Sequence, residues 1–142
     1  MRQQFVLDCS VTMAWCFADE TSKYADAVLN SFAEGYSACV PAIWSLEVCN
    51  ILTVGERRKR ISEAGIFYFV ERLKQLPVLA DPQTHELALN NTLALAREHQ
   101  LSSYDAAYVE LAMRKGISIA TQDKKLKQTA KKIKIPLYTG TV

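Results

Sequence analysis

The sequence lacks long apolar runs and is poor in glycine and proline. Only five of its 142 residues are Gly and four are Pro, whereas 49% are hydrophobic and 23% are charged. No stretch approaches the roughly eighteen apolar residues that a membrane-spanning helix needs, and the first residues show no cleavage pattern of a signal peptide. This composition is typical of a folded globular protein. We therefore expect a single soluble, cytoplasmic domain over residues 1–142, with no linker and no internal repeat.

Metal-binding cysteine motifs are also absent, and the excess of positive charge is small. The cysteines form no CxxC pair and lie in largely apolar neighbourhoods; they are Cys9, Cys16, Cys39 and Cys49. We expect them to be reduced and buried rather than paired in disulfides. The net charge is only +2, so the total charge gives no reason to expect nucleic acid as a partner.

The positive charges are nevertheless unevenly distributed along the chain. Residues 114–134 contain eight Lys and Arg against the single acid Asp123, and residues 57–60 are all basic. Such segments can hold a phosphate backbone, and they are equally compatible with ordinary solvated helix faces. The residues that we expect to contact RNA, if these segments do, are Arg57, Arg58, Lys124, Lys125 and Lys127.

Short apolar segments alternate with segments of helical periodicity. The sequence predicts strands at residues 5–7, 37–40, 78–80, 117–121 and 136–138. It predicts helices at residues 10–17, 22–33, 43–60, 62–76, 82–100, 102–115 and 124–133. Strands that alternate with helices form a parallel sheet covered on both faces. We therefore predict an α/β fold, a three-layer α/β/α sandwich with a central, mostly parallel sheet of four to five short strands.

Two of the predicted strands end at an acid. The apolar run of residues 5–7 is followed by Asp8, and the run of residues 117–121 is followed, after Gln122, by Asp123. An unbroken apolar run is typical of a strand buried on both faces, and open parallel sheets bind ligands outside the carboxyl ends of their strands. We therefore expect both acids at one edge of the sheet. Each has a structural alternative, Asp8 as a turn or cap residue and Asp123 as the N-cap of the next helix.

A third acid, Glu47, lies on a helical face that should point toward the core. On a helical wheel it falls between Trp44 and Ile51, with Asn50 as a polar neighbour three residues further on. A buried carboxylate without a partner is costly, so such a residue is paired or bound to a cation. The alternative is an ordinary glutamate on the solvent face of the helix.

A fourth acid, Asp105, lies on the apolar side of the predicted helix 102–115. The polar arc of that helix is formed by Ser103, Glu110 and Arg114, and Asp105 points away from it. The alternative is again structural. Ser102-x-x-Asp105 has the form of a capping box, in which the acid accepts a hydrogen bond from the backbone of the cap residue.

The hypothesis that follows is a metal site made of four acids, Asp8, Glu47, Asp105 and Asp123. Carboxylates gathered in one place raise one another's pKa strongly unless a cation neutralises them. An all-oxygen set without Cys or His suits Mg²⁺ or Mn²⁺ rather than Zn²⁺. Ser10 and Thr121 each lie two residues from a strand-end acid, and we expect their hydroxyls to support the carboxylates or a bound water.

Four short motifs surround these acids. They are Phe5-Val6-Leu7-Asp8-x-Ser10, Pro41-x-x-Trp44-x-x-Glu47-Val48-x-Asn50-x-Leu52, Leu101-Ser102-x-Tyr104-Asp105-Ala106-Ala107-Tyr108 and Ala120-Thr121-x-Asp123-x-x-Leu126. In this order and spacing they resemble the PIN-domain ribonucleases, specifically the VapC toxins of prokaryotic toxin–antitoxin pairs. The resemblance extends from Phe5 to about Pro136, which is nearly the whole chain.

The resemblance implies a PIN fold, an endoribonuclease that depends on Mg²⁺ or Mn²⁺, a homodimer, and inhibition by a VapB-type antitoxin that inserts a segment at the active site. The acidic quartet of the family matches the four acids named above. Its supporting polar positions match Ser10, Asn50 and Thr121. The chain departs from the family at residues 132–135, where related chains often have a glycine before the last strand.

The expected reaction is hydrolysis of an RNA phosphodiester by metal-activated water, without the 2′-hydroxyl as nucleophile. A phosphatase of the haloacid-dehalogenase type is disfavoured, because Ser10 stands where that chemistry needs a second acid. His85 and His99 lie outside the motifs, which disfavours a metal-free, histidine-based ribonuclease. The remaining alternative is a catalytically silent PIN module that only binds RNA or a protein partner. We expect Tyr104 and Tyr108 in the core rather than as stacking platforms for bases.

Overall fold

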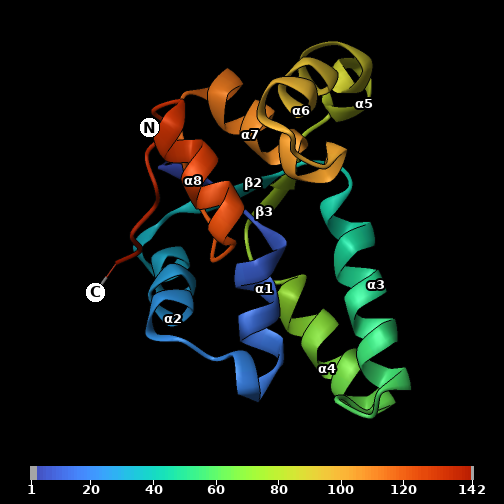
Figure 1. The fold of residues 1–142 in the computed structure, drawn as a ribbon. Coiled ribbons are helices and arrows are strands. Elements are labelled where there is room, and N and C mark those ends of the chain that lie inside the picture. Colours follow the sequence, from blue (N-terminus) through green and yellow to red (C-terminus); the bar gives the residue numbers. More distant parts are fainter. Residues whose placement is uncertain (1–2, 142) are drawn as a thin grey trace.

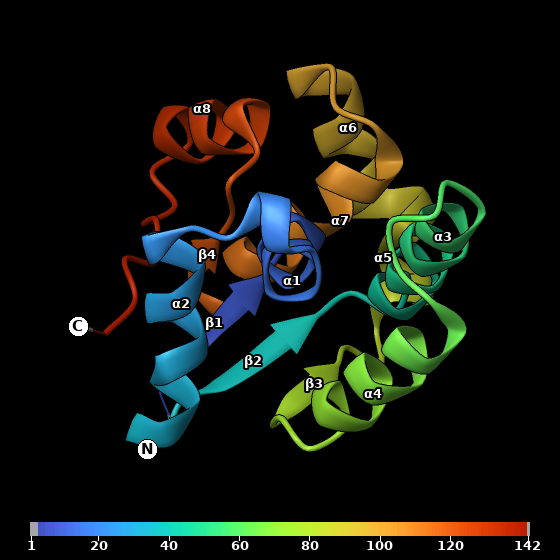
Figure 2. The ribbon, with the colours of Figure 1, turned by 90° about the horizontal axis from the view of Figure 1, so that it is seen from below.

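The central element of the fold is a parallel sheet. The computed structural model describes residues 3–141. The strands are β1 (Gln4–Leu7), β2 (Ser37–Val40), β3 (Val78–Ala80) and β4 (Ser118–Ala120), and they lie in the order β3-β2-β1-β4. All neighbouring pairs are parallel, so the carboxyl ends of the four strands share one edge of the sheet (Figure 2). The predicted α/β sandwich is confirmed.

Helices cover both faces of the sheet. They are α1 (Cys9–Cys16), α2 (Lys23–Asn30), α3 (Trp44–Arg57), α4 (Glu63–Leu73), α5 (Thr84–Leu87), α6 (Leu93–His99), α7 (Ser103–Lys115) and α8 (Lys124–Lys132). Helices α1, α2 and α4 lie on one side of the strands, and α5, α6 and α7 lie on the other (Figure 1). Short 3₁₀ turns, η1 (Ala18–Glu20) and η2 (Ser31–Glu34), flank α2. No helix within residues 3–141 is long and apolar enough to cross a membrane.

Strand β1 lies at the centre of the hydrophobic core. Phe5, Val6 and Leu7 are fully buried, as expected of a strand with a helix layer on each face. The Phe5 ring stacks on Tyr138 with a centroid distance of 4.3 Å, which holds the C-terminal segment against the sheet. Because β1 is paired on both edges and packed on both faces, the next residue, Asp8, has a well-defined position.

Two predicted elements differ from the observed ones. The predicted helix 82–100 is divided into α5, the π-helical segment η3 (Ala88–Thr92) and α6. Asn90 and Asn91 lie in η3, and asparagine has a low helix propensity because its side chain competes for backbone hydrogen bonds. The predicted last strand is reduced to an isolated bridge between Ile119 and Leu137. Pro136 has no N–H with which to extend the ladder.

The cysteines agree with the sequence prediction in part. All four are free, but only Cys9 and Cys39 are buried, whereas Cys16 is half-buried and Cys49 is exposed. Cys49 lies on α3 beside the exposed Asn50, on the side of the helix that faces away from the core. The expectation that every thiol is buried is therefore wrong for this position.

Gly116 ends α7 in a conformation that favours glycine. Its φ is +64° at the C-cap, and a Cβ at this position would meet no atom within 4 Å. Gly116→Ala should therefore lower the free energy of unfolding by about 1 kcal/mol through backbone strain alone. Urea unfolding followed by circular dichroism measures the change. A variant as stable as the wild type would show that this cap does not need glycine.

Candidate functional site

Asp8 is the predicted site residue that the sheet positions most directly. Its N–H donates to the carbonyl of Ala120 at 2.9 Å, and the residue is only 5% exposed. Its Oδ2 accepts hydrogen bonds from the hydroxyls of Ser10 at 2.6 Å and Thr121 at 2.7 Å. Because both bonds end on Oδ2, Oδ1 is the oxygen left to bind a ligand.

The same two hydroxyls join the end of β1 to the start of α8. Thr121 Oγ1 accepts a hydrogen bond from the N–H of Asp123 at 3.0 Å, and Ser10 Oγ accepts one from the N–H of Gln122 at 2.9 Å. Asp123 is also the N-cap of α8, since its Oδ1 accepts from the N–H of Leu126 at 2.9 Å. The capping role therefore uses one carboxylate oxygen of Asp123, and the other stays available.

Glu47 is anchored by a tyrosine rather than by the expected asparagine. It lies in the first turn of α3, is half-buried, and its Oε1 accepts a hydrogen bond from the Tyr108 hydroxyl at 2.6 Å. Tyr108 is fully buried, and burial together with Glu47 raises its pKa, so the phenol stays protonated and donates. Asn50 is exposed. Tyr108 is not among the site residues predicted from the sequence, although its spacing of three from Asp105 places both residues on one face of α7.

Asp105 lies in the first turn of α7 and is half-buried. Its N–H donates to the hydroxyl of the N-cap residue Ser102 at 3.1 Å, which is one half of the predicted capping box. Helix α7 packs against β1 and β4. The structure therefore brings Asp105 toward the edge of the sheet at which Asp8 and Asp123 lie.

Neighbouring negative charges of this set act on the ionisation of Asp8, Glu47 and Asp105. Burial raises the pKa of Asp8, and the negative charge of Asp123 adds to this effect against the hydrogen bonds from the two hydroxyls. Burial, Asp8 and Asp105 raise the pKa of Glu47. Burial, Asp123 and Asp8 raise the pKa of Asp105. Acids from four separate elements thus form one cluster in which negative charge is poorly compensated.

A third strand-end acid, Asp81, shows the opposite behaviour. It follows β3, and its carboxylate is almost fully buried in an ion pair with Arg114. Burial alone would raise the pKa of Asp81, but hydrogen bonds from Arg114, the Gln83 N–H and Thr84 together hold it below its ordinary value. Asp81 and Asp8 therefore occupy equivalent places in the fold, and only Asp8 is left without a cationic partner.

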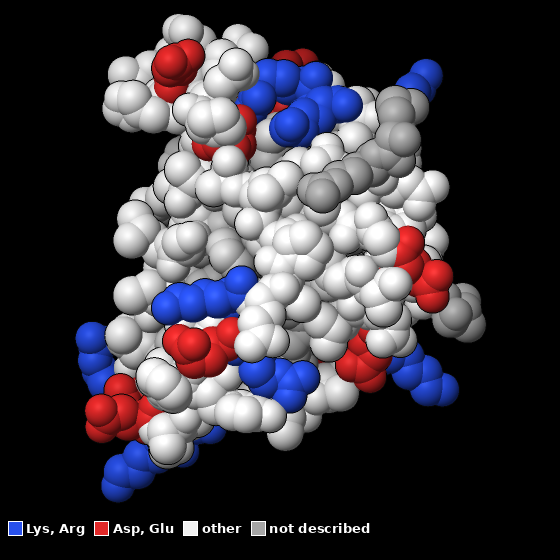
Figure 3. All heavy atoms as spheres, turned by 180° about the vertical axis from the view of Figure 1, so that it is seen from behind, with Lys and Arg blue, Asp and Glu red and all other residues white. Residues whose placement is uncertain are grey.

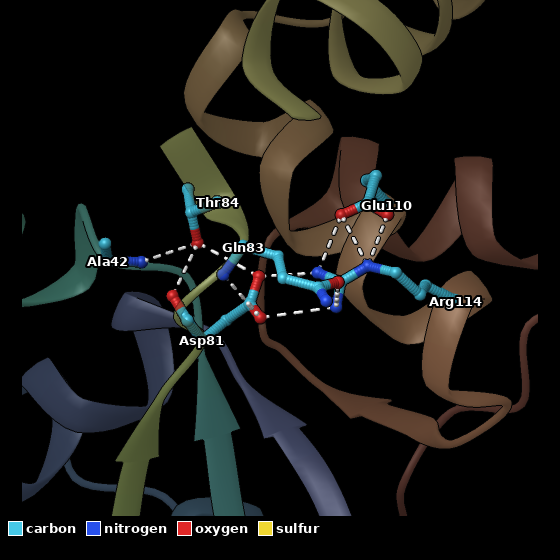
Figure 4. A network of polar contacts seen from close by, with 6 residues as sticks. All are labelled: Ala42, Asp81, Gln83, Thr84, Glu110 and Arg114. Carbon is cyan, nitrogen blue, oxygen red and sulfur yellow. Dashed lines mark hydrogen bonds and ion pairs between the residues drawn. The ribbon is translucent and has the colours of Figure 1, made fainter. Parts of the chain in front are cut away.

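Arg114 also binds Glu110, one turn earlier on α7, and so completes a buried network (Figure 4). Glu110 is only 4% exposed, so the predicted polar arc of this helix does not face solvent at that position. This part of α7 packs against the segment after β3, where Arg114 pairs with both Glu110 and Asp81. The spacing of four between Glu110 and Arg114 predicts their pairing. No pattern in the neighbouring sequence predicts that Arg114 also pairs with Asp81.

The acid cluster is open rather than preformed. Within residues 3–141, no three His, Cys, Asp or Glu side chains lie close enough together to hold a metal ion as they stand. The donors nevertheless fit a hard divalent ion, because all are carboxylate oxygens and the hydrogen bonds to Asp8 and Glu47 use one oxygen of each.

The predicted RNA-contacting residues lie at different distances from this cluster. Lys125 is exposed, donates to the Gln100 carbonyl, and lowers the pKa of Asp105 through its charge. Lys124 is exposed and Lys127 is half-buried on the same helix. Arg57 and Arg58 lie at the far end of α3, about 15 Å from Glu47 at 1.5 Å per residue. The face of the molecule seen in Figure 3 carries basic and acidic side chains interspersed, without a continuous basic patch.

Two hollows mark the surface of the described residues. The larger, of about 850 Å³, is an apolar groove lined by residues of α1, α2 and α4, including Trp15, Leu29 and Phe69. None of the four acids lines it. The smaller, of about 440 Å³, is lined by Glu47 and Asn50 of α3 and by Tyr104 of α7. It therefore borders the acid cluster.

Comparisons with known proteins agree with the observed fold. The family model of the PIN domain matches residues 5–132. Ribonuclease VapC3 of Pyrobaculum aerophilum is 28% identical over 123 residues, which cover 87% of this chain and 92% of that protein. The crystal structure of PAE2754 from Pyrobaculum aerophilum superposes with a TM-score of 0.67 at 25% identity, covering 90% of this chain and 86% of the other.

Proposed function

The chain belongs to the PIN-domain family of nucleases, and we propose that it is an endoribonuclease that depends on Mg²⁺ or Mn²⁺ and acts as a VapC-type toxin. The observation that carries this proposal is the poorly compensated acid cluster at the carboxyl edge of the sheet, in which neighbouring acids and burial raise the pKa of Asp8, Glu47 and Asp105. The relationship to ribonuclease VapC3 supports RNA as the substrate.

In this proposal the ligands of the cation come from Asp8, Glu47, Asp105 and Asp123. A divalent ion held there would polarise a water molecule for attack and offset the negative charge that develops on the phosphate. Ser10 and Thr121 orient the Asp8 carboxylate through its Oδ2, and the Tyr108 hydroxyl orients Glu47 through its Oε1. These donors fix the direction of the two free oxygens before any ligand arrives.

The lysines of α8 are the groups best placed to hold the RNA backbone. The positive charge of Lys125 lowers the pKa of Asp105, so Lys125 lies near the acid cluster. Lys124, the preceding residue, is exposed. Lys127, Arg57 and Arg58 would contact more distant phosphates. Each such contact adds to affinity without adding sequence specificity.

Removal of divalent metal tests the proposed chemistry. Incubation of total RNA with the protein and Mg²⁺ should yield discrete fragments, and EDTA should stop cleavage, because the acid cluster alone repels the phosphodiester. Addition of excess Mn²⁺ after EDTA should restore cleavage. The readout is gel electrophoresis of the RNA. Cleavage at full rate in EDTA would contradict the metal mechanism, and RNA binding without cleavage under all conditions would indicate a catalytically silent PIN module.

The toxin assignment requires a separate experiment. We propose that the protein is a homodimer whose RNA cleavage is blocked by a VapB-type antitoxin that places a segment at the active site. Expression of the chain should then arrest growth, and co-expression of the product of a small neighbouring gene should relieve the arrest. Light scattering measures the dimer. Normal growth during expression of a cleavage-competent protein would contradict the toxin assignment and leave the nuclease proposal intact.

A further inference from the structure

The smaller hollow adjoins the acid cluster at Glu47. It lies between the first half of α3 and the start of α7, and its lining consists of Ile43, Leu46, Glu47, Asn50, Ile51 and Tyr104. Glu47 belongs both to this lining and to the cluster. A ligand whose phosphate is held at the acids therefore has this hollow directly beside it.

Two large side chains in the lining of the hollow, one aromatic and one aliphatic, are mostly exposed to solvent. Tyr104 is 57% exposed and Leu46 is 71% exposed. The prediction that Tyr104 lies in the core is therefore wrong, because it precedes Asp105 at the start of α7, where the helix emerges from the core, whereas Tyr108 one turn later is buried. Exposed aromatic and aliphatic side chains around a hollow are typical of a ligand site.

We propose that this hollow binds one unpaired nucleobase of the RNA, adjacent to the phosphodiester that is cut, with the base stacked on the ring of Tyr104. The proposal rests on the ribonuclease function proposed above. Tyr104 supplies a flat face, and Ile43 and Leu46 supply apolar walls for the edges of the base. The exposed amide of Asn50 offers both a donor and an acceptor to the polar edge of the base.

Charge decides which part of a nucleotide occupies the hollow. The only ionisable acid in its lining is Glu47, and no Lys or Arg belongs to the lining. A phosphate would be repelled there, whereas a neutral base would not. With the proposed divalent cation at the acid cluster, the phosphate is held there, and the base of the nucleotide lies toward Tyr104.

A base can enter this hollow only when it is not stacked within a helix. The site thus selects single-stranded RNA or loops, whose bases can turn outward onto an aromatic side chain. It also makes the position next to the cut sensitive to the identity of the base, because the Asn50 amide is within the same hollow.

The test is cleavage of an oligoribonucleotide pool with a short randomised single-stranded segment, followed by sequencing of the ends. Tyr104→Ala should raise KM by roughly 5- to 100-fold, the equivalent of one lost base–aromatic stack. It should also flatten the base distribution at one position beside the cut. Tyr104→Phe, which keeps the aromatic ring, should have the KM and the base distribution of the wild type. Tyr68→Ala removes a tyrosine of similar exposure, 62%, on α4 and should change neither.

The outcomes separate the two proposals. If the wild type cleaves the pool and Tyr104→Ala leaves KM and the base distribution unchanged, the base site is wrong and the ribonuclease function stands. If the wild type cleaves no RNA with Mg²⁺ or Mn²⁺, both proposals fail. If Tyr104→Ala changes the oligomeric state in light scattering while its RNA kinetics stay those of the wild type, the hollow is a protein interface and the base site is overturned.

Discussion

Asp8→Asn is expected to abolish RNA cleavage and at the same time to make the metal-free protein more stable. Loss of one charged group that positions the reaction costs on the order of 10³-fold in rate. The same substitution removes a negative charge from a buried position beside Asp123. Neutralising such a charge at a functional site should stabilise the protein by about 1 kcal/mol, which corresponds to a rise in Tm of about 4 °C for a domain of this size.

The pH dependence follows from the direction of the pKa shifts. The pKa values of Asp8, Glu47 and Asp105 are raised in the folded protein. A carboxyl with a raised folded-state pKa favours the folded state below its unfolded pKa of about 4, and this contribution is lost as pH rises through the folded-state value. The metal-free wild type should therefore lose stability as pH increases from about 4 toward neutrality. Asp8→Asn should lose less over the same range.

Thermal unfolding with EDTA and with Mn²⁺ measures both effects. Mn²⁺ should raise the Tm of the wild type, because a ligand that binds only the folded state stabilises it, and this rise should be much smaller for Asp8→Asn. Asp26→Asn, at an exposed position on α2, is the matched control and should behave like the wild type. An Asp8→Asn protein that cleaves RNA normally, or that is less stable than the wild type in EDTA, would contradict the proposed site.

Much of the fold and of the candidate site follows from local sequence signals. The unbroken apolar run at Phe5–Leu7 identifies a fully buried strand, and the rule that parallel strands share a carboxyl edge places the residues that follow them. Helical periodicity then places Glu47 and Asp105 on inward-directed faces. Asp8, Glu47, Asp105 and Asp123 are consequently predicted to lie near one another, and in the structure their charges contribute to the raised pKa values of Asp8, Glu47 and Asp105.

What the sequence does not predict depends on contacts between distant segments. A helical wheel groups residues by angle, but it does not say which segment of the chain covers an arc. Glu110 therefore lies on the predicted polar arc and is nevertheless buried. The same limit applies to Tyr104 and Tyr108, which share one helix and differ only in what packs over them. The bond from Tyr108 to Glu47 joins residues 61 positions apart, and no pattern within either helix indicates it.

The network around Arg114 has a structural role that its substitution should reveal. Arg114 donates to Asp81, to the Gln83 side chain and to Glu110. Thr84 donates to Asp81 and accepts a hydrogen bond from the N–H of Ala42 at 3.0 Å. The network thereby ties the end of α7 to the segment after β3 and to the turn before α3. Helices α3 and α7 carry Glu47 and Tyr108, so the network also supports the alignment of these two residues.

Arg114→Met should lower the free energy of unfolding by about 3–5 kcal/mol, because it leaves two buried carboxylates without a countercharge. The side chains of Asp81 and Glu110 are only 2% and 5% exposed. In the wild type, the lowered pKa of Asp81 contributes stability above its unfolded pKa of about 4, and this contribution is lost as pH falls through the still lower folded-state value. The loss of stability in the variant, relative to the wild type, should accordingly be largest near neutral pH and should become smaller in acid, where the carboxyls are protonated.

Urea unfolding at several pH values measures this difference, and two further variants make it specific. Arg97→Met removes an exposed arginine of α6 and should lower the free energy of unfolding by less than about 0.5 kcal/mol. The combination of Asp81→Asn, Glu110→Gln and Arg114→Met leaves no buried charge in the network and should recover part of the loss, since replacing a complete buried ion network by neutral groups is far less costly than removing one member. If Arg114→Met were as stable as Arg97→Met at neutral pH, the two carboxylates would have to find other partners or water, and the network would not be what holds α7 to the segment after β3.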